Sequence, residues 1–364
     1  MLESKLRRLA NLLEELSLRG LILASESMNR WLVGKSLSSI TFIGRDAVRI
    51  YVPVLEYTRA VDHLSGIRSV DVIAYQRYPV DVPEGFKVFS GSIEDLVRKE
   101  ISVRGALGCD LSLLGRTMLN ILTGKCIDVS EELWRIRSSK SDSEIEAISR
   151  AAEIASKAYL DIVKIVSGGI SERDLAGEID RALRRHGSEG YAFPTIVASG
   201  PNASYPHAEP GDKIISPSEA VVIDMGAIYS GYVSDMTRML LGKNSDQEVR
   251  RALEAVEEAL NNSIERIAVG AKASDIDEAA RNTINRMGYG KYYIHSTGHG
   301  VGVEVHEQPI ISRSSQAIIE KGSVITVEPG IYIPGRLGVR IEELVLVEEK
   351  GVSILTKAPR VIIF

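Results

Sequence analysis

Residues 221–236 read VVIDMGAIYSGYVSDM, and residues 324–343 read VITVEPGIYIPGRLGVRIEE. In each stretch two apolar runs flank a short turn, which is typical of a β-hairpin. Each predicted hairpin also carries two acidic residues in surroundings that are otherwise apolar or small. A carboxylate in a buried strand is costly unless it is paired or coordinated, so the pattern predicts a positively charged centre between the hairpins. The four acidic residues are Asp224, Asp235, Glu328 and Glu342.

The sequence before each hairpin repeats as well. GGISERDLAGEIDRALRRHGSEGY at residues 168–191 resembles GAKASDIDEAARNTINRMGYGKY at residues 270–292, and a long amphipathic helix is expected before each of them. At nearly the same spacing, Asp224 aligns with Glu328. We therefore expect two related halves whose facing sheets bring equivalent carboxylates to one central site. The alternative is that any two amphipathic helices look alike.

A third motif, HSTGHGVGVEVHEQP at residues 295–309, supplies histidines. His299 stands between two glycines, which let backbone and imidazole approach a centre that bulkier neighbours would block. His306 follows in VEVHEQP, where Glu307 invites comparison with a HExxH zinc helix. The comparison fails because Pro309 falls inside the motif and no second histidine follows at the required position.

Two further histidines have supporting positions. His295 opens the same motif, and we expect it to support the site rather than bind a metal. His207 lies in ASGPNASYPHAEPG, a loop rich in Gly, Pro, Ser and Asn. Because loops often carry binding residues, His207 is a candidate for substrate binding.

The acidic residues and His299 together suit two metal ions rather than one. Oxygen dominates the set, which favours Mn²⁺, Co²⁺, Fe²⁺ or Zn²⁺. Two ions about 3.5–4 Å apart can bridge a water, lower its pKa and polarise the bond under attack. A salt-bridge network is the alternative, but Arg238 and Arg340 would not balance four carboxylates. The candidate ligands are Asp224, Asp235, His299, Glu328 and Glu342.

The first third of the chain has a different pattern. Leucines recur at helical spacing near the N-terminus, and short apolar strands then alternate with helices, which predicts a small α/β domain. Further on, Ser141 with Glu144 fits a capping box that opens a long helix. We expect an N-terminal α/β domain at residues 1–126, a linker at 127–135 and a catalytic domain at 136–364.

Composition argues against several classes of function. With a net charge of -5 and a pI of about 5.8, the chain has no electrostatic footprint for nucleic acid or for an anionic membrane. No apolar run approaches the roughly 18 residues of a membrane span, and charges scattered along the first helix argue against a signal peptide. Cys109 and Cys126 lack CxxC spacing, so we expect two unpaired, buried cysteines and a cytoplasmic, reducing location.

These motifs resemble those of the methionine aminopeptidase, prolidase and aminopeptidase P group. The catalytic domain of that group has the pita-bread fold, and prolidases also carry a creatinase-like N-terminal α/β domain, so the resemblance covers nearly the whole chain. It implies an α+β catalytic domain with an internal pseudo-twofold repeat and two divalent ions, both of them contacted by Asp235 and Glu342. The residues that match the family ligands are Asp224, Asp235, His299 in GHGVG, Glu328 in VEPG and Glu342 in VRIEE.

The resemblance also implies hydrolysis of small proline-containing peptides by a metal-bridging hydroxide. Glu328 would take the proton of the water and pass it to the leaving proline nitrogen. His306 and His207 would hold the substrate and stabilise the tetrahedral oxyanion. Because the group is commonly dimeric, a homodimer is expected.

Within this group several activities stay open. The intact ligand set argues against the metal-free creatinase, and the N-terminal domain argues against methionine aminopeptidase. A prolidase, which cuts Xaa-Pro dipeptides, is the preferred prediction; an Xaa-Pro aminopeptidase acting on longer peptides is the alternative. Prolidases often carry an arginine just after this motif to bind the dipeptide's carboxylate, but here Ile310 occupies the place and Arg313 is the candidate substitute. A metal-free binding protein that has kept the fold is a further alternative.

Overall fold

The chain forms two units, Met1–Ile136 and Arg137–Phe364, in a computed structural model that describes residues 1–45, 47–67, 69–112, 114–166 and 169–364. The division falls inside helix α6 (Ser130–Ser138). The segment 127–135, which we proposed as a linker, holds a short strand and the first part of this helix.

The first unit is built on one sheet with the strand order β5-β4-β3-β2-β1-β6-β7. Strands β1, β2 and β3 pair antiparallel, and the remaining neighbours pair parallel. The strands are β1 (Gly20–Leu23), β2 (Ile40–Gly44), β3 (Val48–Pro53), β4 (Val70–Gln76), β5 (Val88–Ser90), β6 (Leu107–Cys109) and β7 (Ile127–Asp128). The helices before α6 are α1 (Leu2–Glu15), α2 (Glu26–Val33), η1 (Val54–Glu56), α3 (Tyr57–His63), α4 (Ile93–Ile101) and α5 (Arg116–Leu122). The α/β prediction for this part of the chain is confirmed.

The two cysteines of this unit form a disulfide, so the prediction of unpaired cysteines is wrong. Cys109 ends β6 and Cys126 directly precedes β7, and their Cα atoms lie 5.9 Å apart. The sequence did not reveal the pairing because it depends on two strands that become neighbours only in the folded sheet. The expected reducing location loses the support that unpaired cysteines gave it.

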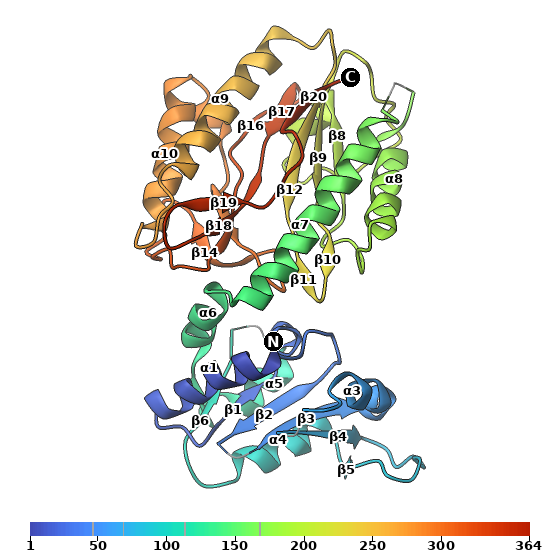
Figure 1. The fold of residues 1–364 in the computed structure, drawn as a ribbon, viewed down its shortest axis with the longest axis vertical. Coiled ribbons are helices and arrows are strands. Elements are labelled where there is room, and N and C mark those ends of the chain that lie inside the picture. The colour runs from blue at the N-terminus through green and yellow to red at the C-terminus, as the bar shows by residue number, and fades with distance from the viewer. Residues whose placement is uncertain (46, 68, 113, 167–168) are drawn as a thin grey trace. The chain divides into compact units, whose positions relative to one another are not determined.

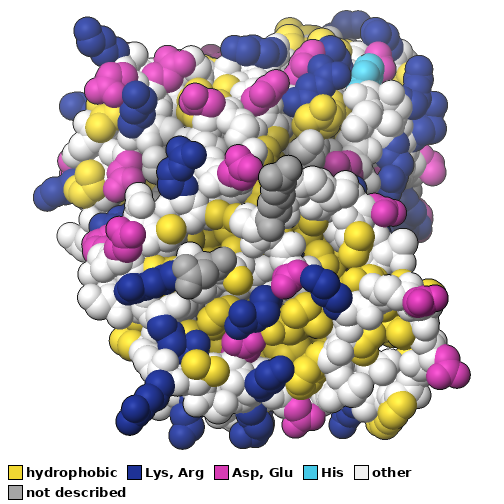
Figure 2. Space-filling view, turned by 60° about the horizontal axis from the view of Figure 1, so that its bottom comes forward, with side chains coloured by type: hydrophobic (Ala, Val, Ile, Leu, Met, Phe, Trp, Pro, Cys, Tyr) yellow, Lys and Arg dark blue, Asp and Glu magenta, His cyan; other side chains and the backbone are white. Residues whose placement is uncertain are grey.

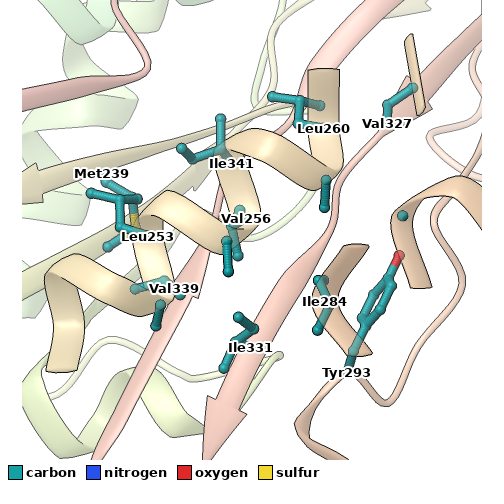
Figure 3. Close-up of a cluster of buried hydrophobic side chains, with 14 of the residues drawn as sticks. Met239, Leu253, Val256, Leu260, Ile284, Tyr293, Val327, Ile331, Val339 and Ile341 are labelled. Carbon is teal, nitrogen blue, oxygen red and sulfur yellow. The ribbon is translucent and has the colours of Figure 1, made fainter. Parts of the chain in front are cut away.

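The second unit places strands between two pairs of helices. Figure 1 shows α7 (Asp142–Val163) and α8 (Glu172–Arg185) on one side of the strands, and α9 (Gln247–Ile264) and α10 (Ala273–Arg286) on the other. The predicted capping box opens α7, where Glu144 Oε2 accepts hydrogen bonds from the backbone N–H and hydroxyl of Ser141. In Figure 3, the apolar side chains of α9 face those of the strands in one buried cluster. The helices α7 and α8 pack on a second cluster.

Two larger sheets and two short ribbons make up the strands of this unit. The sheets have the orders β20-β12-β9-β8 and β14-β13-β15-β18-β19, and the ribbons are β10-β11 and β16-β17. The first half and the C-terminal strand comprise β8 (Ile196–Ser199), η2 (Gly200–Ser204), β9 (Ala220–Met225), β10 (Ile228–Tyr229), β11 (Tyr232–Val233), β12 (Met236–Leu241) and β20 (Val361–Ile363). The second half comprises η3 (Gly290–Tyr292), β13 (Gly298–Gly300), β14 (Glu307–Ile311), β15 (Val324–Val327), β16 (Gly330–Ile333), β17 (Leu337–Arg340), β18 (Glu343–Val347) and β19 (Val352–Ile354).

Each predicted hairpin is one ladder with an interruption. The β9–β12 ladder ends at Met225 opposite Met236, and the chain resumes pairing as β10–β11. The β15–β18 ladder ends at Val327 opposite Glu343 and resumes as β16–β17. The acidic residues lie at or beside these interruptions. The order of two helices followed by an interrupted hairpin therefore occurs twice, whereas a pseudo-twofold axis between the halves stays a prediction.

The register corrects one detail of the predicted repeat. Asp235 and Glu342 are equivalent, since each directly precedes the strand that returns along its ladder. Asp224 lies one residue before the end of β9, but Glu328 lies one residue after the end of β15, so the two are offset by two positions. Because side chains alternate with a period of two, this offset keeps both carboxylates on corresponding faces.

On the face that Figure 2 shows, basic and acidic side chains are interspersed, so charges of one sign are not segregated there. Within the described residues, no helix is both long and apolar enough to span a membrane.

Candidate metal centre

Five strands or strand ends carry the predicted ligands. Asp224 belongs to β9, Asp235 directly precedes β12, His299 is the middle residue of β13, Glu328 directly follows β15 and Glu342 directly precedes β18. The first two come from one half of the unit and the other three from the second half. Each candidate ligand lies in a strand or directly beside a strand end, so the pairing of the strands fixes the backbone position of its side chain.

The structure brings the predicted ligands together. Potential ligand atoms of Asp235, His299 and Glu342 all lie within 4.8 Å of one another. His299 Nε2 lies 3.7 Å from Asp235 Oδ2 and 3.4 Å from Glu328 Oε1. Asp235, His299 and Glu342 are buried, with at most 5% of each residue exposed. The arrangement is a small, largely dry cluster of carboxylates around one imidazole.

Asp224 joins the cluster through Arg340. Arg340 donates to Asp224 Oδ2 at 2.7 Å and to the hydroxyls of Tyr332 at 2.8 Å and Thr237 at 3.0 Å. The second oxygen of Asp224, Oδ1, is buried and has no hydrogen-bond partner among the described residues. An orphaned buried carboxylate oxygen beside other carboxylates is the kind of atom that a divalent cation satisfies.

The alternative of a salt-bridge network fits this cluster poorly. Arg238, which sequence reasoning considered as a neutralising cation, pairs instead with Glu343 at 2.8 Å. Arg340 therefore faces the four carboxylates without the help of Arg238. This imbalance is the condition under which buried acids either stay protonated or bind metal ions.

Burial and mutual repulsion raise the pKa values of Asp235, Glu328 and Glu342. Burial raises the pKa of Asp235 well above its ordinary value, and Glu342, Asp224 and Glu328 add to the shift. Burial likewise raises the pKa of Glu342, with Glu328 and Asp224 contributing. The pKa of Glu328 rises to about 8, chiefly through burial, although Arg340 opposes the shift. The donor set thus fits divalent cations, which supply the positive charge that these residues lack.

His299 is prepared to act as a neutral ligand. Its Nδ1 donates to the carbonyl of Gly300 at 3.1 Å, which leaves Nε2 directed toward the carboxylates. Burial lowers its pKa to about 4, and repulsion from His306 contributes. The flanking glycines have a different role from the one expected. A Cβ at Gly298 would lie 2.0 Å from the carbonyl of Thr326, so this glycine lets neighbouring strands approach β13.

Three more histidines surround the cluster. His306 is exposed, and its ring packs edge-on against that of His299 with centroids 4.4 Å apart. Although the residue is exposed as a whole, partial desolvation of its ring lowers the pKa of His306. His207, which is exposed in the loop after η2, adds to this shift. His295 hydrogen-bonds the Tyr332 hydroxyl at 3.1 Å, which agrees with a supporting role. Sequence reasoning missed Tyr332, because its contact with Arg340 forms only when β16 and β17 pair in the folded ribbon.

Arg313 lines a pocket to which none of the candidate ligands contributes. It is exposed in an open pocket of about 430 Å³ lined by Arg281, Ser296, Ser312 and Ser314. None of the candidate ligands, nor His207 or His306, lines this pocket. Ile310, by contrast, is the cross-strand partner of His299 in the β13–β14 ladder. Directly paired residues share a face of the sheet, so the position beside the metal ligand is apolar in this chain.

Comparison with known proteins identifies relatives over the whole chain. Residues 146–349 match the model of metallopeptidase family M24, and residues 5–139 match the creatinase/prolidase N-terminal domain. The Xaa-Pro dipeptidase of Pyrococcus furiosus is 34% identical, over 99% of this chain and 99% of that protein. The structure resembles an Xaa-Pro dipeptidase from Bacillus anthracis, with a TM-score of 0.86, 29% identity and 100% coverage of both chains.

Another solved structure has the same fold but a different name. An X-Pro aminopeptidase from Thermotoga maritima aligns with a TM-score of 0.86 and 28% identity over 99% of each chain. The fold with its creatinase-like first unit, the family match and the identity over the full length agree. This chain is therefore a member of metallopeptidase family M24, with a creatinase/prolidase N-terminal domain and a pita-bread catalytic domain.

Proposed function

We propose that this metallopeptidase hydrolyses Xaa-Pro dipeptides with two divalent ions held by the five candidate ligands. The observation that carries the proposal is the imbalance of charge at the cluster, where buried carboxylates with raised pKa values converge on His299 and one oxygen of Asp224 has no partner. The substrate class follows from the relatives, because those of Pyrococcus furiosus and Bacillus anthracis are both named Xaa-Pro dipeptidases. Mn²⁺, Co²⁺, Fe²⁺ and Zn²⁺ all suit an oxygen-rich set with one imidazole.

The ligands are assigned by their positions in the cluster. Asp235 and Glu342 occupy equivalent positions on the two ladders, so each is proposed to contact both ions. Asp224 would serve one ion, and His299 with Glu328 the other, in line with the 3.4 Å separation of the latter two. When bound, the two ions would lower the pKa of a water and polarise the peptide carbonyl.

The remaining steps fall to side chains of this chain. Glu328 takes the proton of the attacking water on a carboxylate oxygen and returns it to the nitrogen of the leaving proline. His306, exposed beside His299, and His207 donate hydrogen bonds to the substrate carbonyl oxygen as negative charge develops there. Arg340 orients Asp224 through its bond at 2.7 Å.

An Xaa-Pro aminopeptidase is the second candidate, and Ile310 favours it. A dipeptidase needs a cation for the carboxylate that follows the cleaved bond, and the position beside His299 holds an apolar side chain instead. Arg313 remains the proposed anchor for that carboxylate only if its side chain reaches out of the pocket that it lines. A homodimer and a cytoplasmic location also remain predictions from the sequence.

Hydrolysis of Met-Pro beside Met-Pro-Ala, measured with Mn²⁺ or Co²⁺, tests the proposal. Cleavage of the dipeptide alone, lost in Glu328→Gln and weakened in Arg313→Ala, would support a dipeptidase. Cleavage of both peptides with no effect of Arg313→Ala would make the protein an aminopeptidase. If the metal-loaded protein cuts neither, the peptidase proposal is wrong for these substrates.

A further inference from the structure

A buried carboxylate lies inside the turn that carries His306, which we call the His306 turn (residues 302–307). Glu307, the first residue of β14, is 3% exposed. Its Oε1 accepts the backbone N–H of Val303 at 2.9 Å and that of Glu304 at 3.2 Å. One carboxylate oxygen therefore holds two amides of the same turn, which restricts the conformations available to the residues between them.

Two buried cations hold this carboxylate in turn. Arg137, 1% exposed, pairs with Glu307 and also with Glu304 Oε2 at 3.0 Å. Lys140 Nζ lies 3.5 Å from Glu307 Oε2. Burial raises the pKa of Glu307, but Arg137 and Lys140 outweigh it and leave the pKa below its ordinary value, so the carboxylate is ionised. Arg137 thus binds two acids of the His306 turn, Glu304 and Glu307.

The His306 turn lies against the candidate metal centre. The ring of His306 packs on that of His299, with their centroids 4.4 Å apart. On its other side the turn is tied to the first hairpin, because the Val233 N–H donates to the Gly302 carbonyl at 2.8 Å. The packing is close: a Cβ at Gly302 would lie 2.5 Å from either oxygen of the Glu307 carboxylate.

We propose that Glu307 is a positioning residue of the peptidase. Fixed by Arg137 and Lys140, it sets the conformation of the His306 turn, and thereby the orientation of His306 toward the substrate and of His299 toward the metal ions. The expected effect on catalysis rests on the proposed function, whereas the effect of Glu307 on the conformation of the turn does not. A buried charge cluster is weak evidence for stability, because desolvation offsets the Coulomb attraction, whereas hydrogen bonds to two amides of one turn define its shape.

The test compares Glu307→Gln with Glu100→Gln. Gln keeps the size of the side chain but loses the charge that Arg137 and Lys140 hold. Glu100 of α4 is a matched control, since it is 5% exposed and also pairs with an arginine, Arg49, at 2.8 Å, but belongs to the first unit. At a temperature where each variant is fully folded, Glu307→Gln should lower kcat on Xaa-Pro peptides at least tenfold. KM should change less, and Glu100→Gln should keep its kcat.

A second measurement does not depend on activity. With histidine labelled by ¹³C and ¹⁵N, the imidazole signals of His306 and His299 can be assigned through His306→Ala and His299→Ala. Glu307→Gln should displace both signals, and Glu100→Gln should leave them in place. Unmoved signals in a folded Glu307→Gln variant, with only a lower melting temperature, would overturn the proposal. If wild type cuts no Xaa-Pro peptide, the proposed function fails while these spectra still decide the positioning role.

A milder variant covers the case in which Glu307→Gln does not fold. Glu304 is half-buried and is the other acid that Arg137 binds, with a third of its side chain exposed. Glu304→Gln should displace the His306 signal by a smaller amount. If Glu304→Gln leaves that signal unmoved, the ion pairs of Arg137 do not position the turn.

Discussion

Asp224 and Asp235 lie on the same ladder but meet different surroundings. Asp224 has the guanidinium of Arg340 at 2.7 Å on one oxygen, whereas carboxylates are the main charged neighbours of Asp235. Two like charges 4 Å apart repel by about 4 kcal/mol at an effective dielectric constant of 20. One guanidinium cannot offset this for Asp235, Glu328 and Glu342 together, so the cluster takes up either protons or metal ions.

This balance predicts how the stability of the metal-free protein depends on pH. The pKa values of Asp235, Glu328 and Glu342 are raised by folding, that of Glu328 to about 8. Their stabilising contribution is therefore complete below the unfolded-state pKa near 4 and is lost as the pH rises toward 8. The melting temperature of protein treated with a chelator should fall by several degrees between pH 5 and pH 8, since each pKa unit corresponds to about 1.4 kcal/mol.

The control for this experiment is excess Mn²⁺, which should abolish the fall because bound cations compete with protons for the same oxygens. Glu328→Gln, which removes one titrating group, should show a shallower fall in the metal-free state. A melting temperature that stays constant or rises over this range would mean that the carboxylates are ionised without metal and that the charge argument is wrong.

At the scale of elements, β13 shows how backbone packing positions a ligand. Gly298 has the carbonyl of Thr326 where a Cβ would stand, at 2.0 Å. Gly298→Ala should push β13 away from β15 and carry the His299 imidazole with it, at a cost of about 1–3 kcal/mol for overpacking. We expect Mn²⁺ affinity, measured by calorimetry, to weaken at least tenfold.

Gly177→Ala is the matched substitution in a helix. Gly177 lies in α8, and nothing stands within 4 Å of where its Cβ would be. Ala there should leave metal affinity unchanged and stabilise the helix by up to about 1 kcal/mol. Equal affinity in Gly298→Ala and wild type would show that β13 tolerates the side chain and that the glycine is not needed for the ligand's position.

Patterns with a local cause could be predicted from the sequence, and those that depend on pairing could not. The acids of the hairpins stood out because they are charged residues in apolar strands, and Ser141 with Glu144 predicted the start of α7. The two-residue interruption of each ladder has no local signal, so the equivalence of Asp235 and Glu342 required the register. From the sequence, Glu307 was only a residue in the rejected HExxH comparison. Its contact with Arg137 could not be predicted, because Arg137 lies far away in the sequence.

At the scale of the whole molecule, the candidate metal centre depends on both halves of the second unit. Each half has its own pair of helices, but the apolar cluster that α9 packs on also includes Val222 and Met239 of the first half. Hydrogen bonds between the halves run through the centre: Glu342 N–H donates to the Thr237 carbonyl at 3.2 Å, and Arg340 bonds Asp224. The ligand set therefore forms only when the halves are docked, and metal ions would stabilise that docking by binding the folded state alone.

The first unit carries a separate source of stability, the disulfide between Cys109 and Cys126. The two cysteines are 17 positions apart, and a disulfide that closes a loop of about this length stabilises the folded state by about 3 kcal/mol. Replacing both cysteines by serine should lower the free energy of unfolding of Met1–Ile136 by about this amount. Hydrogen exchange of amides in β1 and β6 measures the change, and amides in β9 and β12 report on the second unit.

Unaltered protection and Mn²⁺ affinity in the second unit would show that it holds its site without help from the disulfide. An equal loss of protection in both units would mean that they unfold together, and an unchanged first unit would mean that the pairing adds nothing to its stability.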